Sequence, residues 1–286
     1  MIEPLVFDVA TGSGVDGPGL RTVVFFKGCP LRCAWCHNPE AQRRESETLR
    51  DPERCIHCGR CAQGCFSGAR RIVGQRFSPR HLGATLAQDK VFFEVSGGGV
   101  TFSGGEPLLF IDYLAALASQ LAAEGIHVAV ETCGIFDLDH YRKVLAQLVD
   151  LVLFDIKILD TVEHRRWTGA GNETVQRNLE ALAKDGAKLV LRVPLVPGIT
   201  ATETNLRAIA RLAARLDIGP VKLLPYNPSG LTKARRLAGR AARKLPPALE
   251  CPMALEEEAR WRRFFKQARS SLGNRAALDD QHACAW

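Results

Sequence analysis

Three cysteines at a C-x3-C-x2-C spacing lie in the stretch Gly28-Cys29-Pro30-Leu31-Arg32-Cys33-Ala34-Trp35-Cys36-His37-Asn38-Pro39. This stretch directly follows β-branched and aromatic residues, which predict a strand over about residues 21–27. Three thiolates so close in the chain can bind one iron–sulfur cubane, because soft sulfur ligands suit such clusters. A cubane has four irons, so three cysteines leave one iron open to another ligand.

A structural zinc site is the alternative for these cysteines. Zinc sites usually have four ligands, often arranged as two C-x2–4-C pairs. His37 directly follows Cys36, so it is poorly placed to complete such a set. The spacing therefore favours a cluster over zinc.

Four further cysteines lie in a charged segment after the first loop, at a C-x2-C-x2-C-x3-C spacing. They are Cys55, Cys58, Cys61 and Cys65. This spacing is the ferredoxin-type run for a [4Fe–4S] cluster, with zinc again as the alternative. In two-cluster ferredoxins the fourth cysteine of such a run binds the other cluster, and this sequence has no second run. We expect Cys65 to complete the set because it is the nearest cysteine, with Cys133, Cys251 or Cys284 as alternatives.

Composition limits the class of protein. The chain has 286 residues, is 46% hydrophobic and carries a formal net charge of +7. This length allows one large core with a small insert, and the modest positive charge does not indicate nucleic-acid binding. No apolar run approaches the roughly 20 residues that cross a bilayer, and the first residues lack a secretory signal pattern. Ten cysteines then favour a reducing compartment, so we expect a soluble, cytoplasmic protein.

Strand-like and helix-like segments alternate along most of the remaining chain. Strands are predicted at about 100–103, 126–132, 151–156, 188–193 and 221–224, and helices at about 111–124, 139–148, 173–184, 203–216 and 255–268. With the strand before the cysteines, six βα repeats result, which indicates an α/β fold with a parallel sheet. Six repeats are fewer than the eight of a closed barrel. We expect a partial (β/α)6 TIM-type barrel, with an open doubly wound sheet as the alternative.

Residues that are unusual in a buried sheet come at or just past each strand end. They are Cys29, residues 103–106, residues 131–133, Asp155 with Lys157, Arg192, and Tyr226 with Asn227. A barrel brings all its strand C-termini to one face, where barrel enzymes carry out their chemistry. The pattern favours a barrel with a site on that face.

The sequence resembles the radical S-adenosylmethionine (SAM) superfamily and, within it, the activating enzymes of glycyl-radical enzymes. The resemblance spans about residues 16–230. It rests on the motifs DGPGLR (16–21), CHNP (36–39), SGGGVTFSGGEP (96–107), DIK (155–157), RVPLVPG (192–198) and LPYN (224–227), together with the cysteine loop. It implies a partial barrel over 1–42 and 81–230, a ferredoxin-like insert over 43–80 after the first strand, and a basic helical extension over 231–286.

The resemblance implies two [4Fe–4S] clusters and SAM as cofactors. Cys29, Cys33 and Cys36 would hold the SAM-binding cluster, and Cys55, Cys58, Cys61 and Cys65 the second. SAM contacts are expected from Trp35, Cys36, His37, Gly104, Gly105, Glu106, Asp155, Lys157, Arg192 and Asn227. Similar enzymes usually have histidine at the position of Asn227, and many carry two cysteine sets in the insert, where this sequence has one.

For several of these residues a structural role is the alternative to a contact with SAM. Trp35 suits an adenine face or ordinary core packing. Gly104 and Gly105 allow backbone to approach the methionine part of SAM, or form a plain turn. Asp155 and Lys157 share a strand face, because side chains alternate along a strand. They match the charges of SAM, or form a surface ion pair.

The resemblance implies an enzyme that, without oxygen, reductively cleaves SAM to methionine and a 5′-deoxyadenosyl radical. That radical would take a hydrogen atom from a glycine of a partner glycyl-radical enzyme. A flavodoxin- or ferredoxin-type protein would donate the electron, and we expect a monomer that binds neither nucleic acid nor membrane. The alternatives are a radical SAM enzyme acting on a small molecule, a peptide or RNA, and a non-catalytic ferredoxin-like electron carrier. The basic residues after Gly230 are more typical of a solvated helix face than of a docking surface.

Overall fold

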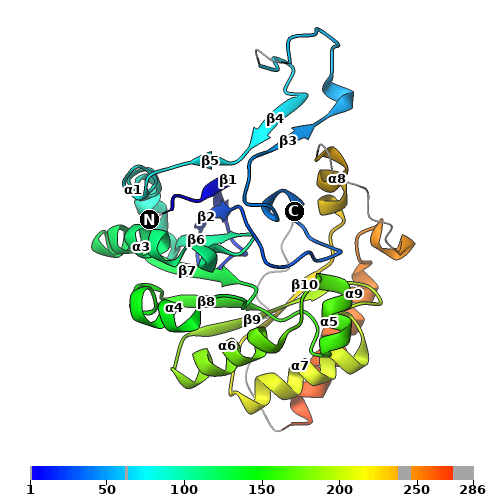
Figure 1. The fold of residues 1–286 in the computed structure, drawn as a ribbon. Coiled ribbons are helices and arrows are strands. Elements are labelled where there is room, and N and C mark those ends of the chain that lie inside the picture. The colour runs from blue at the N-terminus through cyan, green and yellow to red at the C-terminus, as the bar shows by residue number, and fades with distance from the viewer. Residues whose placement is uncertain (1, 62–63, 238–245, 273–286) are drawn as a thin grey trace.

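Six parallel strands, neighbouring in chain order, form most of the central sheet (Figure 1). They are β2 (Arg21–Phe26), β6 (Gly99–Gly104), β7 (His127–Thr132), β8 (Leu151–Asp155), β9 (Leu189–Leu195) and β10 (Val221–Pro225). The structure is a computed structural model that describes residues 2–61, 64–237 and 246–272. The predicted parallel α/β fold is confirmed, with each strand end within about two residues of its expected place.

Helices pack around the outer side of this curved sheet (Figure 1). They include α3 (Ile111–Ala123), α4 (Leu138–Val144), α6 (Glu173–Lys184) and α7 (Glu203–Arg215). The apolar stripe of α3 is buried, with Leu114 and Leu117 fully covered, as a 3.6-residue period predicts. Thr202 begins α7, because its side chain accepts a hydrogen bond from the backbone N–H of Asn205. The strands are near-continuously buried, which is typical of a parallel sheet.

Two antiparallel strands extend the sheet beyond β2 and were not predicted. β1 (Leu5–Ser13) pairs with β2, and β5 (Gln75–Arg76) pairs with β1. The strand at about residues 21–27, expected to be the first, is therefore the second strand of the chain, and the insert follows it. β1 lies near the sheet edge with mostly half-exposed residues, so its sequence lacks the apolar run that marks β2.

Three short helices were also not predicted, α1 (Pro79–Leu86), α2 (Lys90–Ser96) and α5 (Thr161–Thr168). A fourth short helix, α8 (Ser229–Arg236), begins where the basic helical extension was expected. Each has only about two turns, so few positions reveal a helical period. Single 3-10 turns are η1 (Pro39–Ala41), η2 (Pro52–Arg54), η3 (Ala87–Asp89), η4 (Pro107–Phe110), η5 (Ala146–Leu148) and η6 (Pro247–Leu249).

The predicted insert projects from the sheet as a hairpin of β3 (Glu47–Arg50) and β4 (Arg70–Val73), with the second cysteine set in the loop between them (Figure 1). β5 falls within the predicted insert range but belongs to the main sheet. The structure thus describes a hairpin here and does not establish a ferredoxin-like fold.

The C-terminal segment contributes α9 (Leu255–Ser270), close to the helix predicted at 255–268. Arg269 of α9 is buried and donates to the carbonyl oxygen of Gly219 at 2.7 Å. Arg240, Arg243, Lys244 and Cys284 lie outside the described residues. Among the described helices, none combines the length and the hydrophobicity that crossing a membrane requires.

Candidate functional site

The loop that carries the first three cysteines is fixed by backbone hydrogen bonds at both ends. The N–H of Gly28 donates to the carbonyl of Ala41 at 2.6 Å, and the N–H of Ala34 donates to that of Trp167 at 2.9 Å. Gly28 has a φ of +102°, a conformation that favours glycine. The sequence therefore sets the course of this loop immediately after β2.

The three cysteines are half-buried, and their thiols lie close enough to act on one another. Burial raises the pKa of Cys36 to about 11, and it also raises that of Cys33; the Cys29 thiol raises both further. No three His, Cys, Asp or Glu side chains in the described part of the chain surround one point as ligands of a single metal ion would. Each thiolate of a cubane binds a different iron, so an all-sulfur, half-buried donor set of this kind fits a cluster.

Arg192 of β9 is the centre of a charged network inside the barrel. Its Nη1 atom lies 2.6 Å from Glu131 Oε1 and 3.5 Å from Asp16 Oδ1, and its Nε lies 3.7 Å from Asp155 Oδ1. Asp155 stands opposite Arg192 in the parallel register of β8 and β9. Burial acts to lower the pKa of Arg192, but the three carboxylates raise it overall. The guanidinium therefore stays charged and holds the carboxylates together.

Glu131 and Asp16 were not in the predicted set of site residues. Burial raises the pKa of Glu131 to about 7, although Arg192 opposes this, and the Ser103 hydroxyl donates to it at 2.5 Å. Asp16 comes from the β1–β2 connection. The available signals were the acid of the DGPGLR motif and an acid at the end of β7.

Asp155 and Lys157 form the predicted pair, 3.1 Å apart. Burial acts to lower the pKa of Lys157, but Asp155 and the Cys33 thiol raise it overall, which places the ammonium beside the cysteine loop. Asp155 Oδ1 and Arg192 Nε are buried without a hydrogen-bond partner in the described structure, and they face each other as an ion pair at 3.7 Å. A ligand next to the thiols would replace this long contact to reach the carboxylate oxygen or the guanidinium N–H.

Gly104 and Gly105 are required by close packing within the chain. Gly104 has a φ of +115°, and a Cβ there would lie 2.3 Å from the backbone N of Phe26. A Cβ on Gly105 would lie 2.2 Å from the carbonyl oxygen of Gly28. The end of β6 thus packs directly on the start of the cysteine loop, and a SAM contact at these glycines stays a prediction.

Glu106 is fully buried and ties β6 to β7. Its carboxylate accepts hydrogen bonds from the backbone N–H of Cys133 at 2.7 Å, the hydroxyl of Thr132 at 2.9 Å and the N–H of Leu108 at 3.1 Å. Burial raises its pKa to about 7. With these hydrogen bonds, Glu106 positions the ends of β6 and β7 relative to each other.

The other expected SAM contacts are dispersed. Trp35 is 7% exposed and belongs to the hydrophobic core, which is the packing alternative. His37 is exposed beside Cys36. Asn227 is exposed, its Oδ1 accepts from the N–H of Ser229 at 2.9 Å, and it lines a cavity of about 290 Å³.

Helix α8, at the start of the expected basic helical extension, lies against the cysteine loop, a contact that was not predicted. A Cβ on Gly230 would lie 2.1 Å from the carbonyl oxygen of Cys36. Lys233 reaches the same loop, 2.8 Å from Asn38 Oδ1 and 3.0 Å from Glu40 Oε1. The helix therefore packs on the loop by direct backbone contact and by an ion pair.

The second cysteine set lies in the projecting hairpin. Cys55, Cys58 and Cys61 are exposed, and Cys65 is half-buried with its sulfur 3.5 Å from Ser67 Oγ. Cys133, one alternative fourth ligand, is buried in the barrel beside Cys29, and Cys251 is exposed. A cluster at the hairpin stays a prediction.

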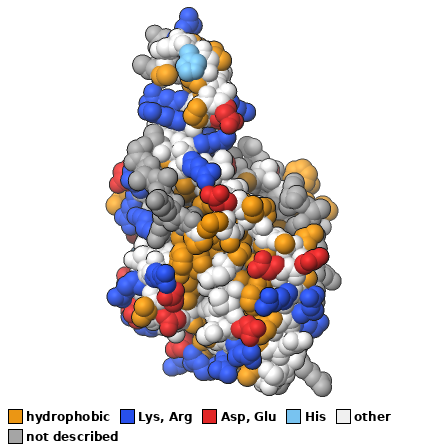
Figure 2. Space-filling model, turned by 90° about the vertical axis from the view of Figure 1, so that its right-hand side faces the viewer, with side chains coloured by type: hydrophobic (Ala, Val, Ile, Leu, Met, Phe, Trp, Pro, Cys, Tyr) orange, Lys and Arg blue, Asp and Glu red, His pale blue; other side chains and the backbone are white. Residues whose placement is uncertain are grey.

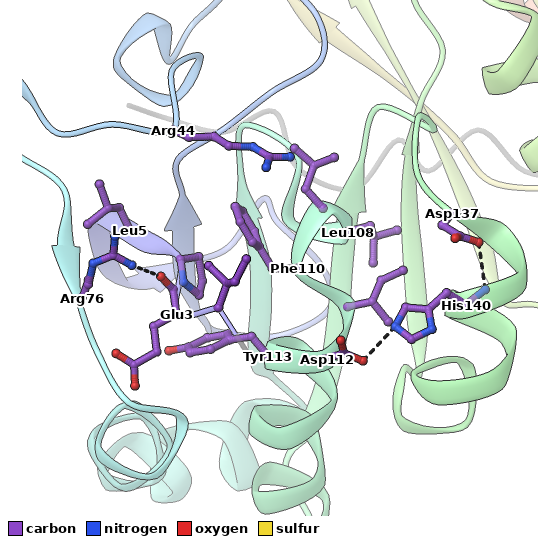
Figure 3. Close-up of a pocket in the computed structure, with 14 residues that line it drawn as sticks. Glu3, Leu5, Arg44, Arg76, Leu108, Phe110, Asp112, Tyr113, Asp137 and His140 are labelled. Carbon is purple, nitrogen blue, oxygen red and sulfur yellow. Dashed lines mark hydrogen bonds and ion pairs between the residues drawn. The ribbon is translucent and has the colours of Figure 1, made fainter.

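A groove of about 370 Å³ lies outside the barrel, between the N-terminal residues, η4 and α4 (Figure 3). The Arg44 guanidinium stands over the Phe110 ring at 5.7 Å, and His140 Nε2 lies 2.8 Å from Asp112 Oδ1. None of the predicted site residues lines this groove.

The face that includes α5 and α8 has an uncharged centre (Figure 2). Hydrophobic side chains gather below the projecting hairpin, while Lys, Arg, Asp and Glu lie mostly at the sides and bottom of this face. The strand ends that lead to α5 and α8 carry Asp155 and the residues around Asn227.

Comparison with known proteins gives consistent matches. Residues 23–209 match the radical SAM superfamily. The chain is 36% identical over 264 residues to the trans-4-hydroxy-L-proline dehydratase activating enzyme of Clostridioides difficile, covering 81% of this chain and 87% of that protein. It is 37% identical over 246 residues to the pyruvate formate-lyase 2-activating enzyme of Escherichia coli K12, covering 85% and 84%. The structure of Streptococcus suis SuiB bound to precursor peptide SuiA has the same fold, with a TM-score of 0.60 at 13% identity over 88% of this chain and 45% of that one.

Proposed function

The chain belongs to the radical SAM superfamily and, within it, to the activating enzymes of glycyl-radical enzymes, and we propose that it cleaves SAM reductively and installs the glycyl radical of a partner enzyme. The observation that carries this proposal is the position of three half-buried thiols beside Lys157 and the Arg192 network. An electron carrier alone has no evident need for buried carboxylates and cations there.

Different residues of the barrel would bind the cluster and SAM. Cys29, Cys33 and Cys36 would hold a [4Fe–4S] cluster, which when reduced supplies one electron for cleavage of bound SAM. Asp155 would turn a carboxylate oxygen that has no hydrogen bond from its 3.7 Å ion pair with Arg192 to the ammonium of SAM. Arg192 would turn the N–H of the same ion pair to the carboxylate of SAM. Burial excludes water, which strengthens both contacts.

The partner would be a glycyl-radical enzyme that docks as a folded protein. The uncharged centre of the face in Figure 2 fits such a contact, because interface cores are depleted of charge. A flavodoxin- or ferredoxin-type donor supplies the electron, and the protein acts as a monomer that binds neither nucleic acid nor membrane. Because free thiols and clusters need a reducing compartment, we place it in the cytoplasm.

The remaining chain would serve the barrel. The hairpin of β3 and β4 would carry the second [4Fe–4S] cluster on Cys55, Cys58, Cys61 and Cys65, which relays electrons or helps to seat the partner. Residues 231–286 would form an extension, and in its described part α8 packs on the cysteine loop and α9 on the barrel.

Anaerobic reconstitution with iron, sulfide, SAM and dithionite tests the activity. We expect 5′-deoxyadenosine from the wild-type protein and from Cys251→Ala, whose thiol is exposed, and none from Cys33→Ala. An electron carrier would hold its clusters and yield no 5′-deoxyadenosine in any of the three.

The choice of substrate needs a second measurement. We expect the doublet of a glycyl radical by EPR when the protein is incubated with a glycyl-radical enzyme encoded beside it. SAM cleavage without a radical on any such partner would favour a small-molecule or peptide substrate.

A further inference from the structure

Lys157 lies in the connection between β8 and α5 (residues 156–160), beyond the end of the strand. The sheet holds the chain as far as Ile156, whose N–H donates to the carbonyl of Arg192 at 2.9 Å. Ile156 and Ile158 are both buried, so the backbone between and after them lies away from water. Buried peptide groups are nearly always hydrogen-bonded, and the groups that follow Ile156 need partners from outside the sheet.

Asn205, in the first turn of α7, supplies such partners. Its side chain donates to the carbonyl of Lys157 at 2.9 Å and to that of Thr200 at 3.0 Å, and its Oδ1 accepts from the N–H of Leu159 at 3.1 Å. Two carbonyls and one N–H match the two donors and the acceptor of an amide. The side chain is buried, so it holds the backbone on both sides of Ile158 without competition from water.

Asn205 is itself fixed. Its backbone N–H donates to the hydroxyl of Thr202, the residue that begins α7, at 3.3 Å. A side chain on a capped helix keeps its direction better than one on a loop. The position of α7 is thus passed on to the backbone of Lys157.

A second asparagine holds the later part of the same connection. Asn172, directly before α6, donates to the carbonyls of Ile158 and Leu159, each at 2.9 Å, and accepts from the hydroxyl of Thr161 at 2.8 Å. None of these bonds reaches Lys157. Asn205 is therefore the asparagine that bonds to the residue carrying the charge.

The ammonium of Lys157 depends on this support more than its neighbour Asp155 does. Asp155 is held in the register of β8 and β9, opposite Arg192. The Lys157 side chain is 10% exposed and lies 3.1 Å from Asp155 Oδ2. A lysine presents one point charge on a flexible stem, so the place of its backbone decides which position the charge reaches. A displacement of 1 Å at a binding site can cost a large part of its effect.

We propose that Asn205 is a positioning residue for SAM: it holds the backbone of Lys157 so that the ammonium meets the carboxylate, the negative group of SAM. The proposal rests on the function proposed above. Asn205 touches no reacting group, so its effect on SAM passes through Lys157.

A double-mutant cycle on SAM affinity tests this dependence. The full-length reconstituted proteins are the wild type, Asn205→Ala, Lys157→Ala and the double variant. SAM affinity is measured from the change that SAM causes in the cluster EPR signal, and iron content is measured in every sample. Asn178→Ala, with and without Lys157→Ala, is the matched control. Asn178 is also a buried amide that donates to two carbonyls, at 3.0 Å each, but these belong to Gly134 and Phe136.

We expect Lys157→Ala to weaken SAM binding about tenfold or more, because a hydrogen bond to a charged group is lost. Asn205→Ala should weaken it about threefold to tenfold when Lys157 is present and less than about twofold when it is absent. Asn178→Ala should change affinity by the same factor in both backgrounds. If Asn205→Ala loses its iron, Asn205→Asp replaces it in the cycle, because aspartate has nearly the same shape and lacks both donors.

An equal loss from the Asn205 variant in both backgrounds would overturn the proposal, as would wild-type affinity in Asn205→Ala or in Lys157→Ala. Loss of iron from both Asn205 variants would overturn it too, because Asn205 would then support the fold as a whole. A wild-type protein that holds its cluster but neither binds nor cleaves SAM would instead contradict the proposed function.

Discussion

Arg192 contacts three carboxylates of the site, and no single sequence motif contains all of them. Its guanidinium meets carboxylates from the β1–β2 connection, from β7 and from β8. One planar group with several N–H donors can contact all three, which a point charge on a flexible stem cannot. The geometry of the guanidinium, beyond its charge, organises this part of the barrel.

Arg192→Lys should therefore weaken SAM binding by about tenfold or more, because lysine keeps the charge but loses the fork of donors. SAM affinity can be measured from the change that it causes in the cluster EPR signal. Arg215→Lys is the control, since Arg215 forms an exposed ion pair with Glu180 at 2.6 Å. Equal SAM affinity in the wild type and in Arg192→Lys would contradict the role given to the guanidinium.

Glu106 should make stability depend on pH. Burial raises the pKa of its carboxyl from the usual 4.5 of a glutamic acid to about 7, so the folded protein keeps a proton that the unfolded chain has released. Stability should then fall as pH rises from about 4.5 to about 7. Glu106→Gln cannot ionise, so its free energy of unfolding should depend less on pH over this range. Urea unfolding of the cluster-free proteins at pH 5 and pH 8 measures the difference.

Glu131 has a raised pKa as well, but it is present in both proteins, so only the difference between them reports on Glu106. The same pH dependence in the wild type and in Glu106→Gln would show that Glu106 does not keep its proton in the folded state.

The sequence predicted best the site residues that are close together in the chain. The cysteine spacing and the shared strand face of Asp155 and Lys157 can be read from a few consecutive residues. Asp16 contacts Arg192 across 176 residues of sequence, and a short sequence pattern cannot predict such a contact. Glu106 accepts hydrogen bonds from Thr132 and Cys133 at the end of β7. These contacts cannot be read from the sequence, which therefore did not show whether Glu106 positions the strands or contacts SAM.

Helix α8 is the element that joins the cysteine loop to the C-terminal part of the chain. Gly230 packs on the carbonyl of Cys36, Lys233 binds the same loop, and Arg236 lies 3.3 Å from Asp51 near the base of the hairpin. One short helix therefore contacts both cysteine-bearing segments. The sequence indicated helix in this basic segment, but two turns carry too little periodicity to show which face packs on the loop.

Gly230→Ala should lower cluster content and SAM cleavage several-fold, because its Cβ would meet backbone rather than a movable side chain. Iron analysis and 5′-deoxyadenosine formation measure the effect. Gly14→Ala is the control, since open space surrounds that position and its φ lies outside the left-handed region. Wild-type values in Gly230→Ala would show that α8 can move without affecting the loop.

The hairpin with the second cysteine set projects away from the barrel that carries the first set (Figure 1). The cysteines of the barrel loop are half-buried, and those of the hairpin are mostly exposed. The parallel strands were predictable because each is an apolar run bounded by turns. The course of the hairpin and the added edge strands were not, since they depend on pairing between distant, partly exposed segments.

Cys58→Ala should lower iron by about four per chain and leave part of the SAM cleavage, because the hairpin lies apart from the SAM-binding residues. Cys33→Ala, in the barrel, should lose a similar amount of iron and all cleavage. Iron analysis with 5′-deoxyadenosine formation compares the two. Equal loss of cleavage would make the hairpin essential to electron delivery or to folding.

The central claim is that the cluster held by Cys29, Cys33 and Cys36 keeps one iron free to bind SAM. Electron–nuclear double resonance of the reduced protein with SAM labelled with ¹⁵N at its amino group tests this directly. We predict a hyperfine coupling between the cluster and the labelled nitrogen, absent in Cys33→Ala. A loaded protein that shows no such coupling, or that holds zinc at this loop, would contradict the account.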